Sequence, residues 1–116
     1  MADSGLEARM EEAIHLIREA VEQKGGMLEL EKKPDLRWTG LARLPGGKLM
    51  LSTHTTGKQA APGDTKSVLE GSADLSMEGR LVARILFHSN STEVELPGGS
   101  RKPFGHAAIA RAFEAI

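Results

Sequence analysis

The feature that most constrains the fold is a change in the spacing of apolar residues at Gly25-Gly26. Before this point apolar residues recur every three or four positions, which is typical of an amphipathic helix with one buried stripe. After it apolar and polar residues alternate, and a period of two is typical of strands with one buried face. The paired glycines favour a helix end. We therefore predict a helix that begins near Leu6 and is followed by strands. Its buried stripe would be Leu6, Met10, Ala13, Ile14, Ile17 and Val21.

Six segments with this alternation are predicted as strands, separated by turn-forming residues such as Gly, Pro and Asn. They cover residues 27–31, 36–44, 48–54, 69–78, 80–88 and 92–96. A second helix is expected from Pro103, because a proline needs no N–H partner in the first helical turn. The order predicts an α+β fold. We expect an antiparallel meander sheet of about five to six strands, with an N-terminal and a C-terminal helix packed on one face.

The size and composition of the chain fit one soluble domain. Its 116 residues suit a single core, with residues 1–5 disordered and residues 6–116 folded. The chain has no cysteine, so disulfides and thiolate metal sites are excluded. A net charge of -1 gives no general attraction to nucleic acid or to anionic membranes. No stretch approaches the roughly 18 apolar residues of a membrane span, and no signal-peptide pattern is present. We expect a cytoplasmic protein.

The sheet face opposite the helices carries apolar residues among polar ones, and it is the candidate binding surface. An apolar stripe with flanking arginine is typical of a protein interface, although single exposed apolar residues are ordinary. The leading hypothesis is a non-catalytic binding or regulatory module that acts through protein–protein contacts at this face and at a predicted loop, residues 55–66. A homodimer is the simplest version. The residues expected on this surface are Leu41, Met50, His54, Val82, Arg84, Leu86 and His88.

A second hypothesis is RNA binding. The run Gly99-Ser100-Arg101-Lys102 and the Ala-rich segment after it resemble the start of the last helix in double-stranded RNA-binding domains. This resemblance implies that Arg101 and Lys102 would contact phosphates across a groove of duplex RNA.

A third hypothesis rests on the histidines. His54-Thr55-Thr56 resembles the His-x-Thr motif of two-histidine phosphoesterases, and His88-Ser89-Asn90 would be its second copy. The resemblance implies that His54 and His88 act as acid and base on a phosphodiester. Three histidines also suit catalytic zinc, but the spacing of His54, His88 and His106 has no metal signature. We therefore predict no metal and no cofactor.

Overall fold

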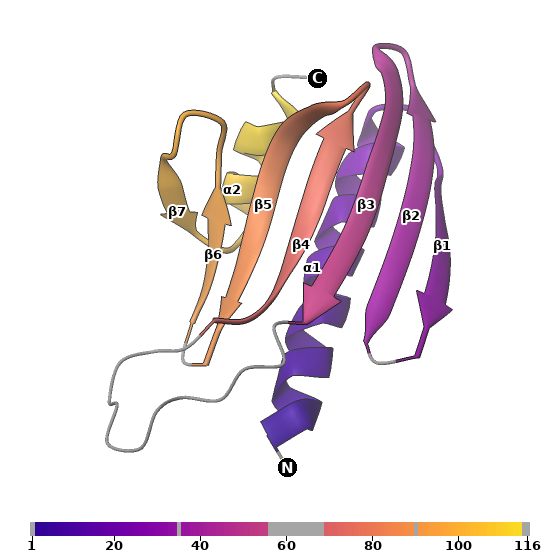
Figure 1. Ribbon diagram of the computed structural model, residues 1–116. Helices are drawn as coiled ribbons and strands as arrows, with labels where there is room; N and C mark the ends of the chain where they lie inside the picture. The colour runs from indigo at the N-terminus through magenta and orange to yellow at the C-terminus, as the bar shows by residue number, and fades with distance from the viewer. Residues whose placement is uncertain (1, 35, 56–68, 90, 115–116) are drawn as a thin grey trace.

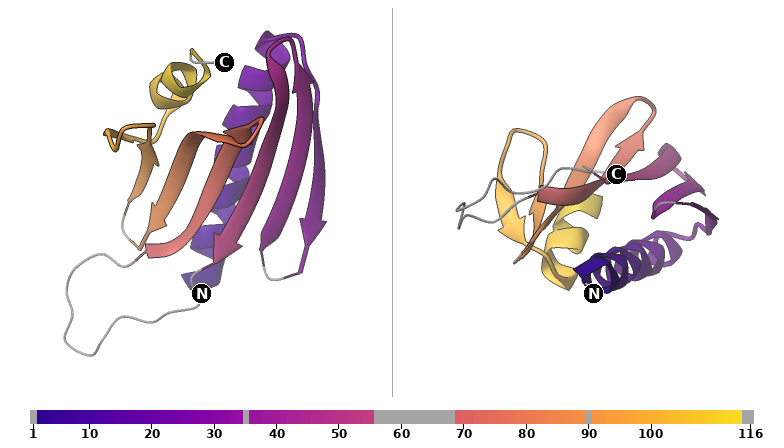
Figure 2. Two further views of the ribbon diagram at one scale, coloured as in Figure 1. Left: turned by 45° about the horizontal axis from the view of Figure 1, so that its top comes forward. Right: turned by 60° about the horizontal axis from the view of Figure 1, so that its bottom comes forward.

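The computed structural model describes residues 2–34, 36–55, 69–89 and 91–114. Its strands form one antiparallel sheet whose spatial order follows the chain from β1 to β7 (Figure 1). Both helices lie on the same side of this sheet (Figure 2), which confirms the α+β meander. The elements are α1 (Ala2–Gln23), β1 (Leu28–Lys33), β2 (Arg37–Leu44), β3 (Gly47–Thr55), β4 (Leu69–Met77), β5 (Arg80–His88), β6 (Thr92–Glu95), β7 (Arg101–Pro103) and α2 (His106–Phe113).

Helix α1 packs its apolar stripe against the inner face of the sheet. It begins at Ala2, earlier than the expected start near Leu6. Met10 and Ile17 are fully buried, and Met10 packs closely against Gly71 of β4. A Cβ atom at Gly71 would lie 2.9 Å from Met10 Cε and 2.8 Å from the carbonyl oxygen of His54. Glycine is therefore required here for the helix and two strands to meet.

The inner face of the sheet supplies the rest of the core. Alternate residues of β3, β4, β5 and β6 point toward the helices, as period-two patterning requires. The side chains at the centre of this face are each at most 2% exposed to solvent: Leu49, Leu51, Ala73, Leu75, Ala83, Ile85, Phe87 and Val94. From α2, Ile109 and Phe113 close the core. The other side of the sheet, which carries no helix, is called the open face below.

The prediction that Val82 lies on the open face is wrong, and Leu81 lies there instead. The pairing of β4 with β5 shifts register between Leu75 and Ser76, so Leu75 lies opposite Ala83 while Ser76 lies opposite Leu81. Val82 is the extra residue of this β-bulge, which changes the alternation locally. Val82 is consequently 7% exposed and joins the core, whereas Leu81 is 37% exposed on the open face.

The prediction of a helix start at Pro103 is also wrong, because a seventh strand occupies this segment. Gly98 and Gly99 have φ angles of 97° and 93°, which glycine adopts without strain. They reverse the chain after β6, and β7 then pairs antiparallel with β6. Pro103 is tolerated in β7 because this strand lies at the sheet edge, where a missing N–H breaks no ladder. Helix α2 begins only at His106.

Candidate interaction surface

An apolar row crosses the open face from β2 to β5. In the register of the sheet, Leu41 lies opposite Met50, Met50 opposite Ser76, and Ser76 opposite Leu81. Met50 is 57% exposed and Leu81 is 37% exposed, while Leu41 is half-buried. We call Leu41, Met50 and Leu81 the apolar row. Met27 is 73% exposed and comes just before β1, outside this row.

Next to the apolar row, the open face of β4 to β7 carries a connected set of ion pairs. Arg84 Nε donates to Asp74 Oδ1 over 2.8 Å and its guanidinium lies 3.9 Å from Glu95. The hydrogen bond to Asp74 and the charge of Asp74 raise the pKa of Arg84 above its ordinary value. The contacts continue through Arg101 to Glu93, and a carboxylate oxygen of Glu93 lies 2.9 Å from His88 Nε2. We call this set the ion-pair ladder. Its members are Asp74, Arg84, His88, Glu93, Glu95 and Arg101.

Leu86 lies within this ladder and not on an accessible surface. It is on the open face, between Ser72 of β4 and Glu93 of β6, yet it is only 7% exposed. Arg9 of α1 donates to the carbonyl oxygen of His88 and fixes the adjoining strand end. Leu86, Arg84 and His88 are therefore held by neighbours from their own chain.

The charges on the open face of β1, β2 and β3 behave differently. Six exposed side chains there make no ion pair within the part of the chain that the structure describes: Glu29, Glu31, Lys33, Arg37, Arg43 and Lys48. Two like-charged pairs even face each other across strands, Lys33 with Arg37 and Arg43 with Lys48. Like charges directly opposite are unfavourable. This half of the open face is therefore charged and exposed, and no ion pair among the described residues neutralises it.

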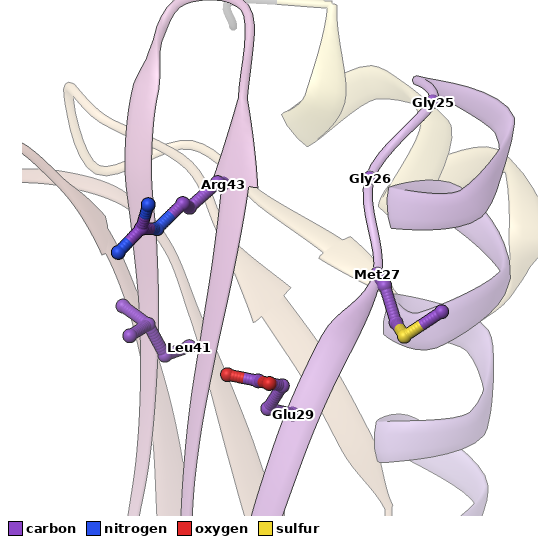
Figure 3. Close-up of a pocket in the computed structure, with 6 residues that line it drawn as sticks. All are labelled: Gly25, Gly26, Met27, Glu29, Leu41 and Arg43. Atoms are coloured by element: carbon purple, nitrogen blue, oxygen red, sulfur yellow. The ribbon is translucent and has the colours of Figure 1, made fainter.

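A depression of about 470 Å³ lies at the β1 side of this half-face (Figure 3). The α1–β1 connection and residues of β1 and β2 line it: Gly25, Gly26, Met27, Glu29, Leu41 and Arg43. The carboxylate of Glu29 points toward Leu41, whereas Met27 points away from both (Figure 3). The depression thus joins one end of the apolar row to the edge of the sheet.

The structure does not bring His54 and His88 together. His54 is exposed on β3 and lies opposite Ser72 of β4, while His88 is on β5. Strand β4 lies between them, and two strand spacings of about 4.8 Å each exceed hydrogen-bond reach. His106 is on α2, 3.6 Å from Glu19 of α1, on the other side of the sheet. Among the residues that the structure describes, no group of three or more His, Cys, Asp or Glu could hold a metal ion.

The RNA hypothesis placed Arg101 and Lys102 at the start of a helix, but both residues lie on β7. Arg101 is held by the carboxylates of Glu93 and Glu95. Lys102 lines a separate depression of about 640 Å³ beside the start of α2, together with His106 and Arg111. The predicted binding loop, residues 55–66, lies outside the described residues except for Thr55.

Comparisons with known proteins give no relative. The chain matches no protein-family model, no curated protein and no solved structure. Within the described ranges, no helix is long and apolar enough to cross a membrane. The interpretation of the surface therefore depends on its own geometry.

Proposed function

We propose that this protein is a non-catalytic binding module that contacts another protein through the β1–β3 half of its open face and the adjoining Leu81 of β5. The observation that carries the proposal is the apolar row, which exposes Met50 and Leu81 beside charges that form no ion pair among the described residues. Exposed apolar residues that share one row of the sheet, interrupted by Ser76 alone, favour an interaction site over chance exposure. Interfaces also combine an apolar centre with a polar rim.

The ion-pair ladder supports the choice of this half. A partner that covered Arg84 or Arg101 would have to displace or desolvate carboxylates that already bind them, which is costly. A partner that covered Arg37, Arg43 or Lys48 would meet cations with no counter-ion in the described chain. The β1–β3 half is therefore the one on which a partner gains most.

The charges also define the chemistry of the partner. On this half-face four exposed cations, Lys33, Arg37, Arg43 and Lys48, surround two exposed carboxylates, Glu29 and Glu31. A surface with an apolar centre and an acidic rim would complement it, and rim charges mainly set association rate and specificity. We therefore expect a protein partner with acidic residues around an apolar contact.

The test is a double substitution in the apolar row, Met50→Glu with Leu81→Glu. Both side chains are exposed, so the fold should survive, whereas burial of two carboxylates in an interface is strongly unfavourable. Proteins captured by the wild type would be compared quantitatively with those captured by the variant. Each captured protein would then be purified and titrated directly against both by calorimetry.

A matched control places two glutamates on the opposite side of the molecule, Ala107→Glu with Ala110→Glu, at exposed positions of α2. The proposal requires a directly titrating partner that loses affinity for the Met50 and Leu81 variant and keeps it for this control. A partner that binds all three proteins equally, or the lack of any directly titrating partner, would overturn it.

A further inference from the structure

The two edges of the sheet are protected to different degrees. At one edge β7 has only three residues and ends in Pro103, and short edge strands with proline resist further pairing. At the other edge β1 has six residues and contains no proline, and among the described strands it has a neighbour only on its β2 side. An exposed edge strand presents unpaired backbone N–H and C=O groups that another strand can bind. The β1 edge is therefore open to strand addition.

The sequence of β1 separates its charges by sign. Glu29 and Glu31 come first along the strand, and Lys32 and Lys33 end it. Lysine at an edge normally discourages pairing. An antiparallel copy of the same strand, however, brings the acidic part of one chain against the basic part of the other. The edge is therefore complementary to itself and less complementary to a strand of one charge sign.

We propose that β1 pairs antiparallel with β1 of a second copy of this chain, with Glu29 opposite Lys33 of the partner subunit. Symmetry then places Lys33 opposite Glu29 of the partner subunit, so two cross-strand ion pairs form. Lys33 lies beside Arg37 with no carboxylate partner in the described chain, and a carboxylate from the second copy neutralises this pair. The two sheets become one continuous sheet.

Charges and the length of strand overlap together favour this register among those that keep equivalent faces together. Sliding the strands by two residues, so that Leu30 meets its own copy, would place Glu29 opposite Glu31 of the partner subunit twice. Like charges directly opposite destabilise a sheet. Sliding them the other way would still form two ion pairs, between Glu31 and Lys33 of the partner subunit, but it would place Lys32 opposite its own copy and shorten the paired part of the strand from residues 29–33 to residues 31–33. In the proposed register the only like-charged pair is Glu31 with its own copy at the two-fold axis, and a lysine lies diagonal to each of these carboxylates.

The surroundings of β1 leave room for a second copy. On the helix side a depression of about 220 Å³ lies between α1 and the sheet edge, lined in part by Ile14, Leu30 and Trp38. On the open side lies the depression that contains Glu29 and Leu41. Because the two-fold axis runs perpendicular to the sheet, the open faces of both copies point the same way. The inference goes beyond the proposed function, since it uses the edge and leaves the apolar row available.

The test is charge reversal with mixing. Glu29→Lys and Lys33→Glu would each replace two attractive pairs by two repulsive ones, and each should weaken dimerisation about tenfold or more. Mixed in equal amounts, the two variants should form a heterodimer, because the lysines of one variant then face the glutamates of the other in both cross-strand pairs. Sedimentation equilibrium over a range of concentrations would measure these masses against 12.4 kDa for one chain.

A further variant tests the register without weakening the contact. Glu31→Gln removes the like-charged pair at the two-fold axis, so it should tighten the dimer a few-fold. Thermal unfolding of every variant would establish that it is folded. The variant that carries both Met50→Glu and Leu81→Glu should still sediment as the wild-type dimer. This result would show that the dimer forms through the β1 edge and not through the apolar row of the open face.

Three results would overturn the proposal. They are a wild-type chain that stays monomeric at all concentrations, a mixture of the two reversed variants that forms no heterodimer, and a dimer that is lost only when Met50 and Leu81 are substituted.

Discussion

Thr53 provides a sharp test of how the start of β2 is held, and we predict that Thr53→Val destabilises the fold. Thr53 is 4% exposed on the inner face. Its hydroxyl donates to the carbonyl oxygen of Leu36 over 3.0 Å and accepts from the backbone N–H of Trp38 over 2.7 Å. Leu36 has a φ of 58°, which is unfavourable for a bulky residue. One hydroxyl thus satisfies two backbone groups of a strained turn.

Valine has the same shape without the hydroxyl, so the loss falls on these two hydrogen bonds. An unsatisfied buried group costs about 1–3 kcal/mol, and partial access to water at this turn reduces the sum for both to about 2–3 kcal/mol. For a domain of this size that corresponds to a fall of roughly 8–12 °C in the midpoint of thermal unfolding. Calorimetry or circular dichroism would measure it.

Two controls make the result specific. Thr53→Ser keeps the hydroxyl and removes one methyl group, so it should cost clearly less than valine. Thr55→Val makes the same chemical change at an exposed position on the same strand, and surface substitutions usually stay within about 0.5 kcal/mol. A fall below about 2 °C for Thr53→Val, or an equal fall for Thr55→Val, would refute the assignment to the hydroxyl.

Two further predictions concern packing and pH. Gly71→Ala should destabilise the fold by about 1–3 kcal/mol, because its Cβ would press on the backbone of β3 and on α1. Gly5 lies on α1, and no atom lies within 4 Å of a Cβ built there, so Gly5→Ala should instead stabilise the fold by about 0.5 kcal/mol. Equal effects of the two substitutions in urea unfolding would contradict the packing argument. The hydrogen bond to Glu7 is the larger cause and the charge of Glu7 the smaller cause that raise the pKa of Lys32 above 10.5. The stability that this pair contributes is therefore complete below pH 10.5 and is lost as pH rises through the higher pKa of the folded state. NMR titration of the Lys32 side chain should show this pKa fall in Glu7→Gln and stay unchanged in Glu22→Gln, and no fall in Glu7→Gln would contradict the assignment.

Most of the fold follows from the sequence because the apolar period reports which face of an element is buried. The period of α1 and the alternation through β4 need no tertiary information. The bulge at Val82 cannot be predicted without tertiary information. A single extra residue shifts the alternation by one position, so the faces assigned to residues on one side of the bulge are reversed. The sequence does offer one signal of the bulge. Leu81, Val82 and Ala83 are three consecutive apolar residues, which is consistent with burial of both Val82 and its neighbour Ala83.

The sequence is less informative at β7, where local signals conflict. Pro103 suits both the first turn of a helix and an edge strand. The choice depends on whether β6 has a free side, which is a property of the whole sheet. Gly98 and Gly99 mark a reversal, and a reversal directly after a strand favours a hairpin over a helix entry.

The exposed residues of the open face differ from those predicted from the sequence, because the exposure of a side chain depends on its neighbours in space. Met50 and Leu41 were predicted on the open face and lie there, while Val82 entered the core and Leu86 became enclosed by the ion-pair ladder. Leu81 was missed, since its face follows from the bulge. Which charges are paired also depends on register, and only the register links Arg84 to both Asp74 and Glu95.

The meander topology connects these observations. A sheet whose spatial order follows the chain must have its first and last strands as its edges, and each edge needs its own protection. At β7 the chain supplies proline, short length and carboxylate-bound Arg101. At β1 it supplies charges of both signs, of which Glu29, Glu31 and Lys33 find no ion-pair partner among the described residues. Charges that only discourage pairing would be most effective with a single sign, because two copies of one strand would then repel each other. The division of β1 into an acidic and a basic part instead favours one antiparallel partner, its own copy, and disfavours the shifted register in which Glu29 would face Glu31 of the partner subunit.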